Sequence, residues 1–220
     1  MREVVYDTET TGKHHDRDKI VEIAAIEMID GVPTGRVFHT LINPECHIPD
    51  EVVAVHGITN EKVKDAPKFK EIIPDLLDFF RDARAIAHNS EFDEKFIDSE
   101  LKSADHKESF WSVVAETEDT LRLSRRIWQG TDQNGVKFKH KLDDILERCG
   151  IDASARTLHG ALIDSQLLAS AYKIMKMKLA ELGPSLEEDA PRPPIKRLSV
   201  EFDLPMVGAA PAAPPRGPRP

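Results

Sequence analysis

The chain has 220 residues, of which 40% are hydrophobic and 31% are charged. This length and composition suit one soluble domain with a substantial core, because single domains most often contain about 100–150 residues. The 39 acidic residues outnumber the 30 basic residues and give a formal net charge of −9. The charge argues against a protein that holds nucleic acid on a broadly basic surface. It leaves open a protein whose acidic side chains perform a chemical task.

The cysteines and the apolar pattern indicate the compartment. Cys46 and Cys149 are the two cysteines, and their separation argues against a disulfide scaffold or a structural zinc site. We expect both to be reduced, partly buried thiols, as in a cytosolic protein. No basic and apolar leader is present, and no apolar stretch approaches the ~20 residues of a membrane span. The sequence therefore predicts a cytoplasmic protein with no membrane partner.

The composition changes abruptly near Gly183. Residues 184–220 contain ten of the 15 prolines together with many alanines. Such a segment buries too little apolar surface to offset its ordering entropy, which predicts a disordered tail. The five basic and five acidic residues of this tail cancel, so the net charge belongs to residues 1–183. We therefore expect one folded domain at 1–183 and, at 184–220, a Pro- and Ala-rich tail that could bind a partner.

The body of the chain alternates strand and helix patterns. Four runs of β-branched and apolar residues are expected to form strands, at residues 3–7, 20–28, 36–42 and 84–87. Four segments with apolar residues at helical spacing are expected to form helices, at residues 69–82, 92–101, about 140–149 and 160–178. Asp30 and Gly31 mark a hairpin turn, and Pro74 should lie in the first turn of its helix or kink it. The order predicts an α/β domain with a mixed central sheet.

Asp7 and Glu9 form the first candidate site. They lie two residues apart at the end of a strand, so both carboxylates project to one face. Paired carboxylates at a strand end suit Mg²⁺ or Mn²⁺, although roughly seven acid-x-acid pairs are expected by chance in this composition. Residues 4–6 are too apolar for a surface segment, so Asp7 should emerge at the carboxyl end of a buried strand. In open α/β sheets, ligands bind at that end.

Two more candidate positions complete the set. Asp93 follows the strand expected at 84–87, and His159 precedes Asp164 by five residues. Five residues correspond to a separation of ~140° on a helix, so the two side chains cannot share one helical face. We expect His159 in the loop before Gly160 and Asp164 inside the helix. Each residue alone is explained as well by a surface acid or a capping histidine, whereas four acids and one histidine together indicate a site.

These residues lie in three stretches, at 7–12, 88–93 and 159–164. Their order and spacing resemble the three motifs of the DEDDh (DnaQ-like) 3′–5′ exonuclease family. Further matching stretches lie at 55–59, 141–143 and 156–162. With them the chain most resembles the proofreading epsilon subunits of bacterial DNA polymerase III. The resemblance covers about residues 3–178 and implies a ribonuclease H-like mixed sheet flanked by helices, hence an exonuclease domain at 1–183.

The resemblance implies a metal-dependent 3′–5′ DNA exonuclease that releases nucleoside 5′-monophosphates from 3′ ends and proofreads in replication. Two divalent cations, Mg²⁺ or Mn²⁺, would be held by four carboxylates, those of Asp7, Glu9, Asp93 and Asp164. All four would be catalytic together with His159, which would act as the general base. Ten residues would receive the terminal nucleotides: Thr8, Glu9, Thr10, Thr11, His56, Gly57, Ile58, His88, Asn89 and Phe92. Core packing is the alternative role for Ile58 and Phe92.

The implied partners are DNA 3′ ends, either single-stranded or frayed, with the replicative polymerase subunit and the sliding clamp as further candidates. Residues 197–202 are similar to the short peptide that docks sliding clamps, but Arg197 stands where that peptide prefers Gln, and a chance match explains it as well. Residues 129–139 look like a hairpin-like insertion relative to the family. The tail is shorter and richer in proline than the polymerase-binding extension of typical epsilon subunits.

Two alternative functions stay open. One is a DEDDh exoribonuclease that trims RNA 3′ ends, and the other is a non-catalytic module of a replication assembly. The stretches at 10–12 and 56–58 favour DNA, by analogy with the family. All five catalytic positions are filled, which argues against the non-catalytic module.

Overall fold

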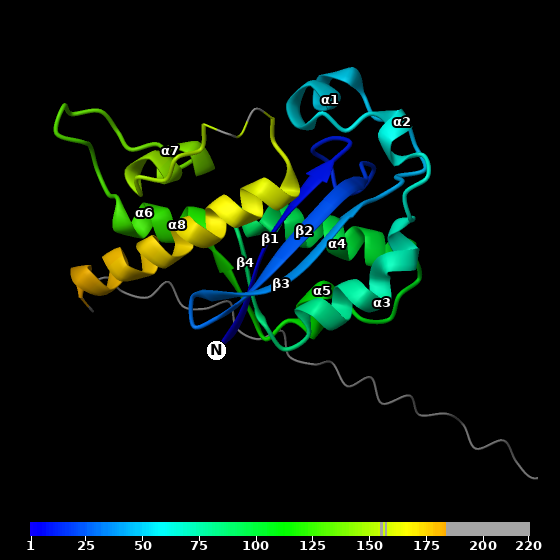
Figure 1. Ribbon diagram of the computed structural model, residues 1–220, viewed down its shortest axis with the longest axis horizontal. Coiled ribbons are helices and arrows are strands. Elements are labelled where there is room, and N and C mark those ends of the chain that lie inside the picture. The colour runs from blue at the N-terminus through cyan, green and yellow to red at the C-terminus, as the bar shows by residue number, and fades with distance from the viewer. Residues whose placement is uncertain (155, 157, 184–220) are drawn as a thin grey trace, which may run out of the picture.

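The computed structural model describes residues 1–154, 156 and 158–183, which include one mixed five-stranded sheet (Figure 1). The strand order is β3-β2-β1-β4-β5. The strands are β1 (Arg2–Thr10), β2 (Ile20–Ile29), β3 (Val32–Leu41), β4 (Arg84–Ala87) and β5 (Glu116–Asp119). β2 is antiparallel to β1 and β3, whereas β4 is parallel to both β1 and β5. The predicted α/β class with a mixed central sheet is confirmed.

Helices cover both faces of this sheet (Figure 1). The helices are α1 (Asp50–His56), α2 (Asn60–Val63), α3 (Phe69–Phe80), α4 (Ser90–Ser103), α5 (Phe110–Val113), α6 (Thr120–Ile127), α7 (Leu142–Arg148) and α8 (Ala161–Leu182). Successive side chains of β1 alternate between the faces, since a strand has a period of two. Val4 and Tyr6 pack with α3, α4 and α5 in one core cluster, and Val5 packs with α6, α7 and α8 in another.

The predicted hairpin between β2 and β3 is confirmed. Asp30 and Gly31 form its turn with φ values of 50° and 74°. Such a turn needs positive φ at both central residues, and Gly and Asp tolerate it. β3 begins at Val32 rather than at residue 36, because Val32 and Pro33 pair with Ile29 and Met28 across the turn.

Two expectations need correction, and one strand was not expected. Pro74 lies in the second turn of α3 rather than the first, because the helix already begins at Phe69 and the Glu71 carboxylate accepts the Lys68 N–H at 2.7 Å. Cys46 is exposed rather than partly buried, because it lies in a surface bend, while Cys149 is half-buried; both are free. β5 was not predicted, because Glu116–Asp119 contains no apolar run.

Residues 129–139 form a small hairpin-like loop between α6 and α7. Thr131 and Lys137 make an isolated antiparallel bridge, and the Asp132 carboxylate accepts the N–H groups of Asn134 and Val136. None of the helices between residues 1 and 183 that the structure describes has the length and apolar character of a membrane span. Residues 184–220, with the expected tail and the segment 197–202, lie outside the described residues.

Candidate active site

Two acidic side chains lie near the carboxyl end of β1, as the period of two requires. Asp7 and Glu9 are both half-buried, and they share the face of the sheet that Val5 presents to α8. The strand is central, with β2 on one side and β4 on the other. The two carboxylates are therefore held on rigid backbone rather than on a loop.

Asp93 approaches the same strand from α4. It lies in the first turn of that helix and is 3% exposed. The Thr8 hydroxyl donates to Asp93 Oδ1 at 2.6 Å, and the Thr8 N–H donates to the same oxygen at 3.1 Å. Thr8 thus ties Asp93 to β1 between Asp7 and Glu9.

His159 and Asp164 lie where the helical geometry predicts. His159 precedes Gly160, the N-cap of α8, and Asp164 lies in the first turn of that helix. His159 Nδ1 is 3.3 Å from Asp164 Oδ2. The His159 side chain is 49% exposed, whereas that of Asp164 is 5% exposed. A histidine open to solvent beside a buried carboxylate can exchange protons with water.

The segment before α8 is anchored to two distant elements. The His159 N–H donates to the Val55 carbonyl of α1 at 3.2 Å. The Ala161 N–H at the start of α8 donates to Glu22 Oε2 at 2.9 Å, and Glu22 Oε1 lies 2.8 Å from His39 Nε2. The carboxylate of Glu22 therefore satisfies a free N–H of the helix N-terminus and fixes α8 against β2.

Glu9, His159 and Asp164 could share a metal ion. One ligand atom of each lies within 4.8 Å of those of the other two. Carboxylate oxygens are the ligands that hard divalent cations prefer, and imidazole suits several transition metals. The structure therefore brings together residues from the first and the third predicted motif, which are about 150 positions apart in the chain.

The carboxylates repel one another strongly. Burial raises the pKa of Asp7 well above its usual range, and the charges of Asp93, Glu9 and Asp164 raise it further. Burial and the neighbouring carboxylates of Asp164 and Glu22 raise the pKa of Glu9 to about 8. Burial likewise raises the pKa of Asp93 to about 7, against the hydrogen bonds from Thr8. Such a cluster is suited to divalent cations, because positive charge would offset the repulsion.

Arg156 is a member of this cluster that the sequence did not assign to the site. Its side chain is 8% exposed and pairs with Asp164: Nη2 donates to Oδ2 at 2.7 Å, and Nε lies 2.5 Å from Oδ1. Nη2 also lies 2.6 Å from His159 Nδ1, and Nη1 pairs with Asp143. The signal in the sequence was its place in the matching stretch 156–162. Arg156 supplies the positive charge next to Asp164 in this structure.

The threonines and the glycine predicted to bind substrate shape the backbone near the carboxylates. Thr10 and Thr11 are buried: the Thr10 hydroxyl donates to the Gly12 carbonyl at 2.5 Å, and the Thr11 hydroxyl accepts the Lys19 N–H at 2.9 Å. Gly57 ends α1 in the left-handed region, with φ of 70°. These residues fix the turn after β1 and the end of α1.

Three further residues of that set are wholly or partly buried. His56 is buried, and its Nδ1 accepts the Ile58 N–H at 3.0 Å. Ile58 is 1% exposed and packs with Val21 and other core residues. The Phe92 ring packs against that of Phe96 with centroids 4.8 Å apart. The core packing weighed for Ile58 and Phe92 is what the structure describes, and contact of either with substrate stays a prediction.

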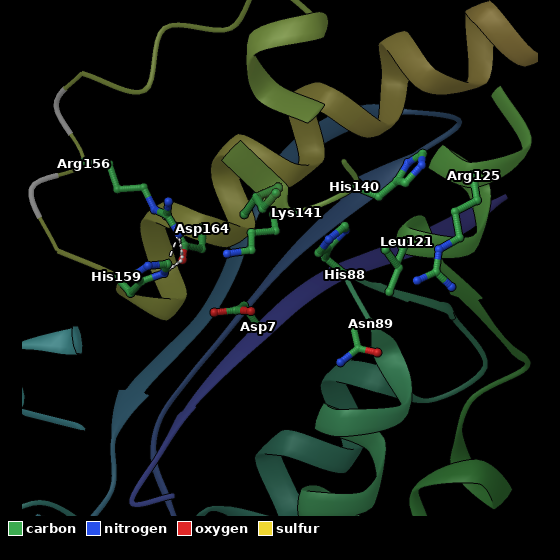
Figure 2. A pocket seen from close by; sticks show the side chains of 11 residues that line it. Asp7, His88, Asn89, Leu121, Arg125, His140, Lys141, Arg156, His159 and Asp164 are labelled. Carbon is green, nitrogen blue, oxygen red and sulfur yellow. Dashed lines mark hydrogen bonds and ion pairs between the residues drawn. The ribbon is translucent and has the colours of Figure 1, made fainter. Parts of the chain in front are cut away.

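A cavity of about 550 Å³ opens on the carboxylates (Figure 2). The predicted site residues in its lining are Asp7, His88, Asn89, His159 and Asp164. The remaining lining residues are Leu121, Arg125, His140, Lys141, Leu142 and Arg156. Its volume lies in the range of about 300–1,000 Å³ that is typical of ligand pockets. The cavity therefore offers space for a ligand next to the acidic cluster.

Comparisons with known proteins agree with this geometry. The exonuclease family model matches residues 4–172. The DNA polymerase III subunit epsilon of Rickettsia conorii is 43% identical over 173 residues, which cover 78% of this chain and 72% of that protein. The same subunit of Haemophilus influenzae is 38% identical over 179 residues, which cover 79% of this chain and 67% of that protein.

Solved structures show the same fold. A structure of exonuclease I without ligand matches with a TM-score of 0.68 and 16% identity, covering 82% of this chain and 43% of that one. A structure of exonuclease X in complex with 5′ overhanging duplex DNA matches with a TM-score of 0.56 and 25% identity, covering 79% of this chain and 91% of that one. The chain spans less than half of exonuclease I, so that likeness concerns the fold alone. The family match and the identity to its relatives show that this chain belongs to the exonuclease family, among the DNA polymerase III epsilon subunits.

Proposed function

We propose that this chain is a metal-dependent 3′–5′ exonuclease that releases nucleoside 5′-monophosphates from DNA 3′ ends and proofreads in replication. The observation that carries the proposal is the clustering of four carboxylates from β1, α4 and α8, with His159 beside Asp164 and with Asp7, His159 and Asp164 in the lining of one cavity. Family membership supports the reaction class. We assign the exonuclease domain to residues 1–183.

Mg²⁺ or Mn²⁺ fits the acidic cluster. Two such ions would be held by the clustered oxygen ligands of Asp7, Glu9, Asp93 and Asp164. The pKa values of the first three are raised, and the fourth is paired with Arg156. When bound, a pair of divalent ions activates water and stabilises the leaving 3′ oxygen. The residues of this chain position the ligands: Thr8 orients Asp93, and Glu22 fixes the helix that carries Asp164.

His159 is the proposed general base. It would accept a proton from the water that attacks the terminal phosphodiester, as the P–O bond to the preceding nucleotide breaks and its 3′ oxygen leaves. When Nδ1 of His159 carries the proton and donates it to Asp164, Nε2 is free to accept the proton from water. When Arg156 donates to Nδ1 instead, Nδ1 is unprotonated and Nε2 carries the proton, which is the opposite tautomer. The working base therefore needs Arg156 to move away from Nδ1.

The substrate-binding assignments extend from this centre. His88 and Asn89 line the cavity and would contact the strand directly. The turn after β1 and the end of α1 would receive the terminal nucleotide through Thr8, Glu9, Thr10, Thr11, His56, Gly57, Ile58 and Phe92. Membership among the DNA polymerase III epsilon subunits supports DNA rather than RNA as the substrate. The name of these relatives also supports association with a polymerase. Binding of a sliding clamp through the tail is a further proposal that no described residue bears on.

Digestion of matched DNA and RNA oligonucleotides by the full chain, with Mg²⁺ or Mn²⁺, tests the function. We expect release of nucleoside 5′-monophosphates from the DNA 3′ end. RNA trimming that is faster by orders of magnitude would assign the chain to the exoribonuclease alternative, and absence of both activities would favour the non-catalytic module.

His159→Ala should bind Mn²⁺ and DNA but lose most turnover. Turnover at the wild-type rate would refute the role of His159 as the general base. Asp7→Ala should lose activity through weaker Mn²⁺ binding, so an unchanged Mn²⁺ titration would contradict its ligand role.

A further inference from the structure

The cavity has a second wall that the catalytic assignment does not use. Arg125 and His140 line it away from Asp7 and Asp164, and Lys141 lines it between these two groups (Figure 2). Arg125 comes from α6, and the other two come from the segment just before α7. Figure 2 shows Lys141 between the carboxylates of Asp7 and Asp164 and the side chains of His140 and Arg125. One cavity therefore joins an acidic end to a basic end.

The two cations of this basic wall are not engaged in ion pairs within the described part of the chain. The side chains of Arg125 and Lys141 are both exposed, and no carboxylate pairs with either among residues 1–154, 156 and 158–183. Arg122, on the same helix as Arg125, instead pairs with Asp119 at 3.7 Å. A cation without an acidic partner in a chain of net charge −9 is available to bind an anion.

His140 supports the same wall as a hydrogen-bonding group. Its Nδ1 lies 3.0 Å from the Ser124 hydroxyl, which holds the ring next to α6. Burial lowers the pKa of His140, and the positive charges of Arg148 and Arg125 lower it further. The lowered pKa favours the neutral ring, so the charge of the wall comes mainly from Arg125 and Lys141.

We propose that Arg125 and Lys141, with His140 beside them, bind the phosphodiester backbone of the strand just upstream of its 3′-terminal nucleotide. The proposal rests on the proposed exonuclease function and adds the path of the strand. A strand whose 3′ end lies at Asp7 and Asp164 can place its upstream phosphates along the other end of the same cavity. Arg and Lys form strong charge-assisted hydrogen bonds with phosphate oxygens. They would hold DNA locally on an otherwise acidic protein.

Two double variants of the full chain test the strand path. Arg125→Gln with Lys141→Gln removes the two positive charges of the wall. Lys70→Gln with Lys173→Gln removes two exposed positive charges from α3 and α8, outside the cavity, and is the matched control. Binding of a fluorescein-labelled single-stranded oligonucleotide is measured by anisotropy in EDTA from 50 to 200 mM NaCl. Hydrolysis is measured with the oligonucleotide and with thymidine 5′-monophosphate p-nitrophenyl ester, which has no upstream phosphate.

We expect the wall variant to bind the oligonucleotide about tenfold more weakly than wild type at low salt, as loss of two solvent-exposed ionic contacts implies. The slope of log K against log salt should become shallower by about 1.4, since each contact to a single strand contributes about 0.7. The fall in kcat/KM should be about tenfold greater for the oligonucleotide than for the ester. The control should change binding by less than twofold.

Three results would overturn the strand path. The first is unchanged binding and salt slope in the wall variant, and the second is an equal loss in the control, which would indicate bulk charge. The third is an equal fall in kcat/KM on both substrates, which would place the wall at the reacting phosphate. Failure of the exonuclease function has a different signature: wild type would hydrolyse neither substrate, while anisotropy would still report on the wall.

Discussion

The metal-free protein should lose stability as the pH rises, because Glu9 is more easily protonated in the folded chain than in the unfolded chain. Its pKa rises from the ordinary 4.5 to about 8 in the fold. An acid with a raised pKa contributes stability at low pH, and this contribution is lost as the pH rises from 4.5 through about 8. At 1.36 kcal/mol per pKa unit, the full penalty is about 5 kcal/mol. Net stabilities of only about 5–15 kcal/mol make this a large effect.

The test compares wild type with Glu9→Gln by urea unfolding in EDTA, at pH 5.5 and pH 8.0. Between these values the linkage amounts to about 3 kcal/mol. Glutamine keeps the size and removes the charge, so we expect the variant to gain about 3 kcal/mol over wild type between pH 5.5 and pH 8.0. The pH dependence from Asp7 and Asp93 has the same sign, and removal of the Glu9 charge lowers the pKa of Asp7, which adds to the gain of the variant at pH 8.0. Saturating Mn²⁺ should raise the stability of wild type more than that of the variant.

Glu27→Gln is the control with the opposite sign. Burial alone would raise the pKa of Glu27, but hydrogen bonds from Arg2 and Thr34 and the charge of Arg36 lower it. Ionised Glu27 contributes fully to the stability of the fold above pH 4.5, and this contribution is lost as the pH falls. Glu27→Gln should therefore be destabilised about equally at pH 5.5 and pH 8.0. The reasoning is refuted if Glu9→Gln is no more stable than wild type at pH 8.0 in EDTA, or if its gain is independent of pH.

Three further predictions concern the neighbours of the acidic cluster. Arg156→Gln should destabilise the metal-free protein by about 3–5 kcal/mol, because it leaves buried Asp164 without its cation, and should tighten Mn²⁺ binding; urea unfolding and calorimetry measure the two effects. Thr8→Val removes the hydroxyl that donates to Asp93, so the pKa of Asp93 should rise further and Mn²⁺ affinity at pH 7 should fall about 10–100-fold by calorimetry. Glu22→Ala should cost about 1 kcal/mol in urea unfolding, because the Ala161 N–H loses its acceptor, and should lower kcat.

The parts of the fold and site that follow a local period were predictable from the sequence. The period of two placed Asp7 and Glu9 on one face of β1, and the 100° step of a helix separated His159 from Asp164. The turn at Asp30 and Gly31 followed from its backbone requirements. In each case the deciding interaction lies within a few residues, so one sequence suffices to find it.

The parts that depend on tertiary pairing were not predictable in this way. β5 pairs with β4 in parallel, and its Glu116 and Glu118 lie 2.6 and 3.5 Å from Arg84 on that strand, but no apolar pattern marks it. Arg156 contacts Asp164 eight residues further along the chain, a spacing that no strand or helix period singles out. The role of Glu22 depends on the register that sets it opposite Glu9. Long-range contacts of polar residues leave no periodic signal in one sequence.

The distribution of charge, rather than its sum, reconciles an acidic protein with an acidic substrate. Four carboxylates of this chain lie together, where their mutual repulsion favours cations. Arg125 lies at the other end of the same cavity and Lys141 lies between it and the carboxylates, and a cation without a carboxylate partner favours phosphate. A net charge of −9 would repel DNA at long range, so the proposed binding relies on this local arrangement. A strand entering the cavity would meet positive charge along its backbone first and the acidic cluster only at its 3′ end.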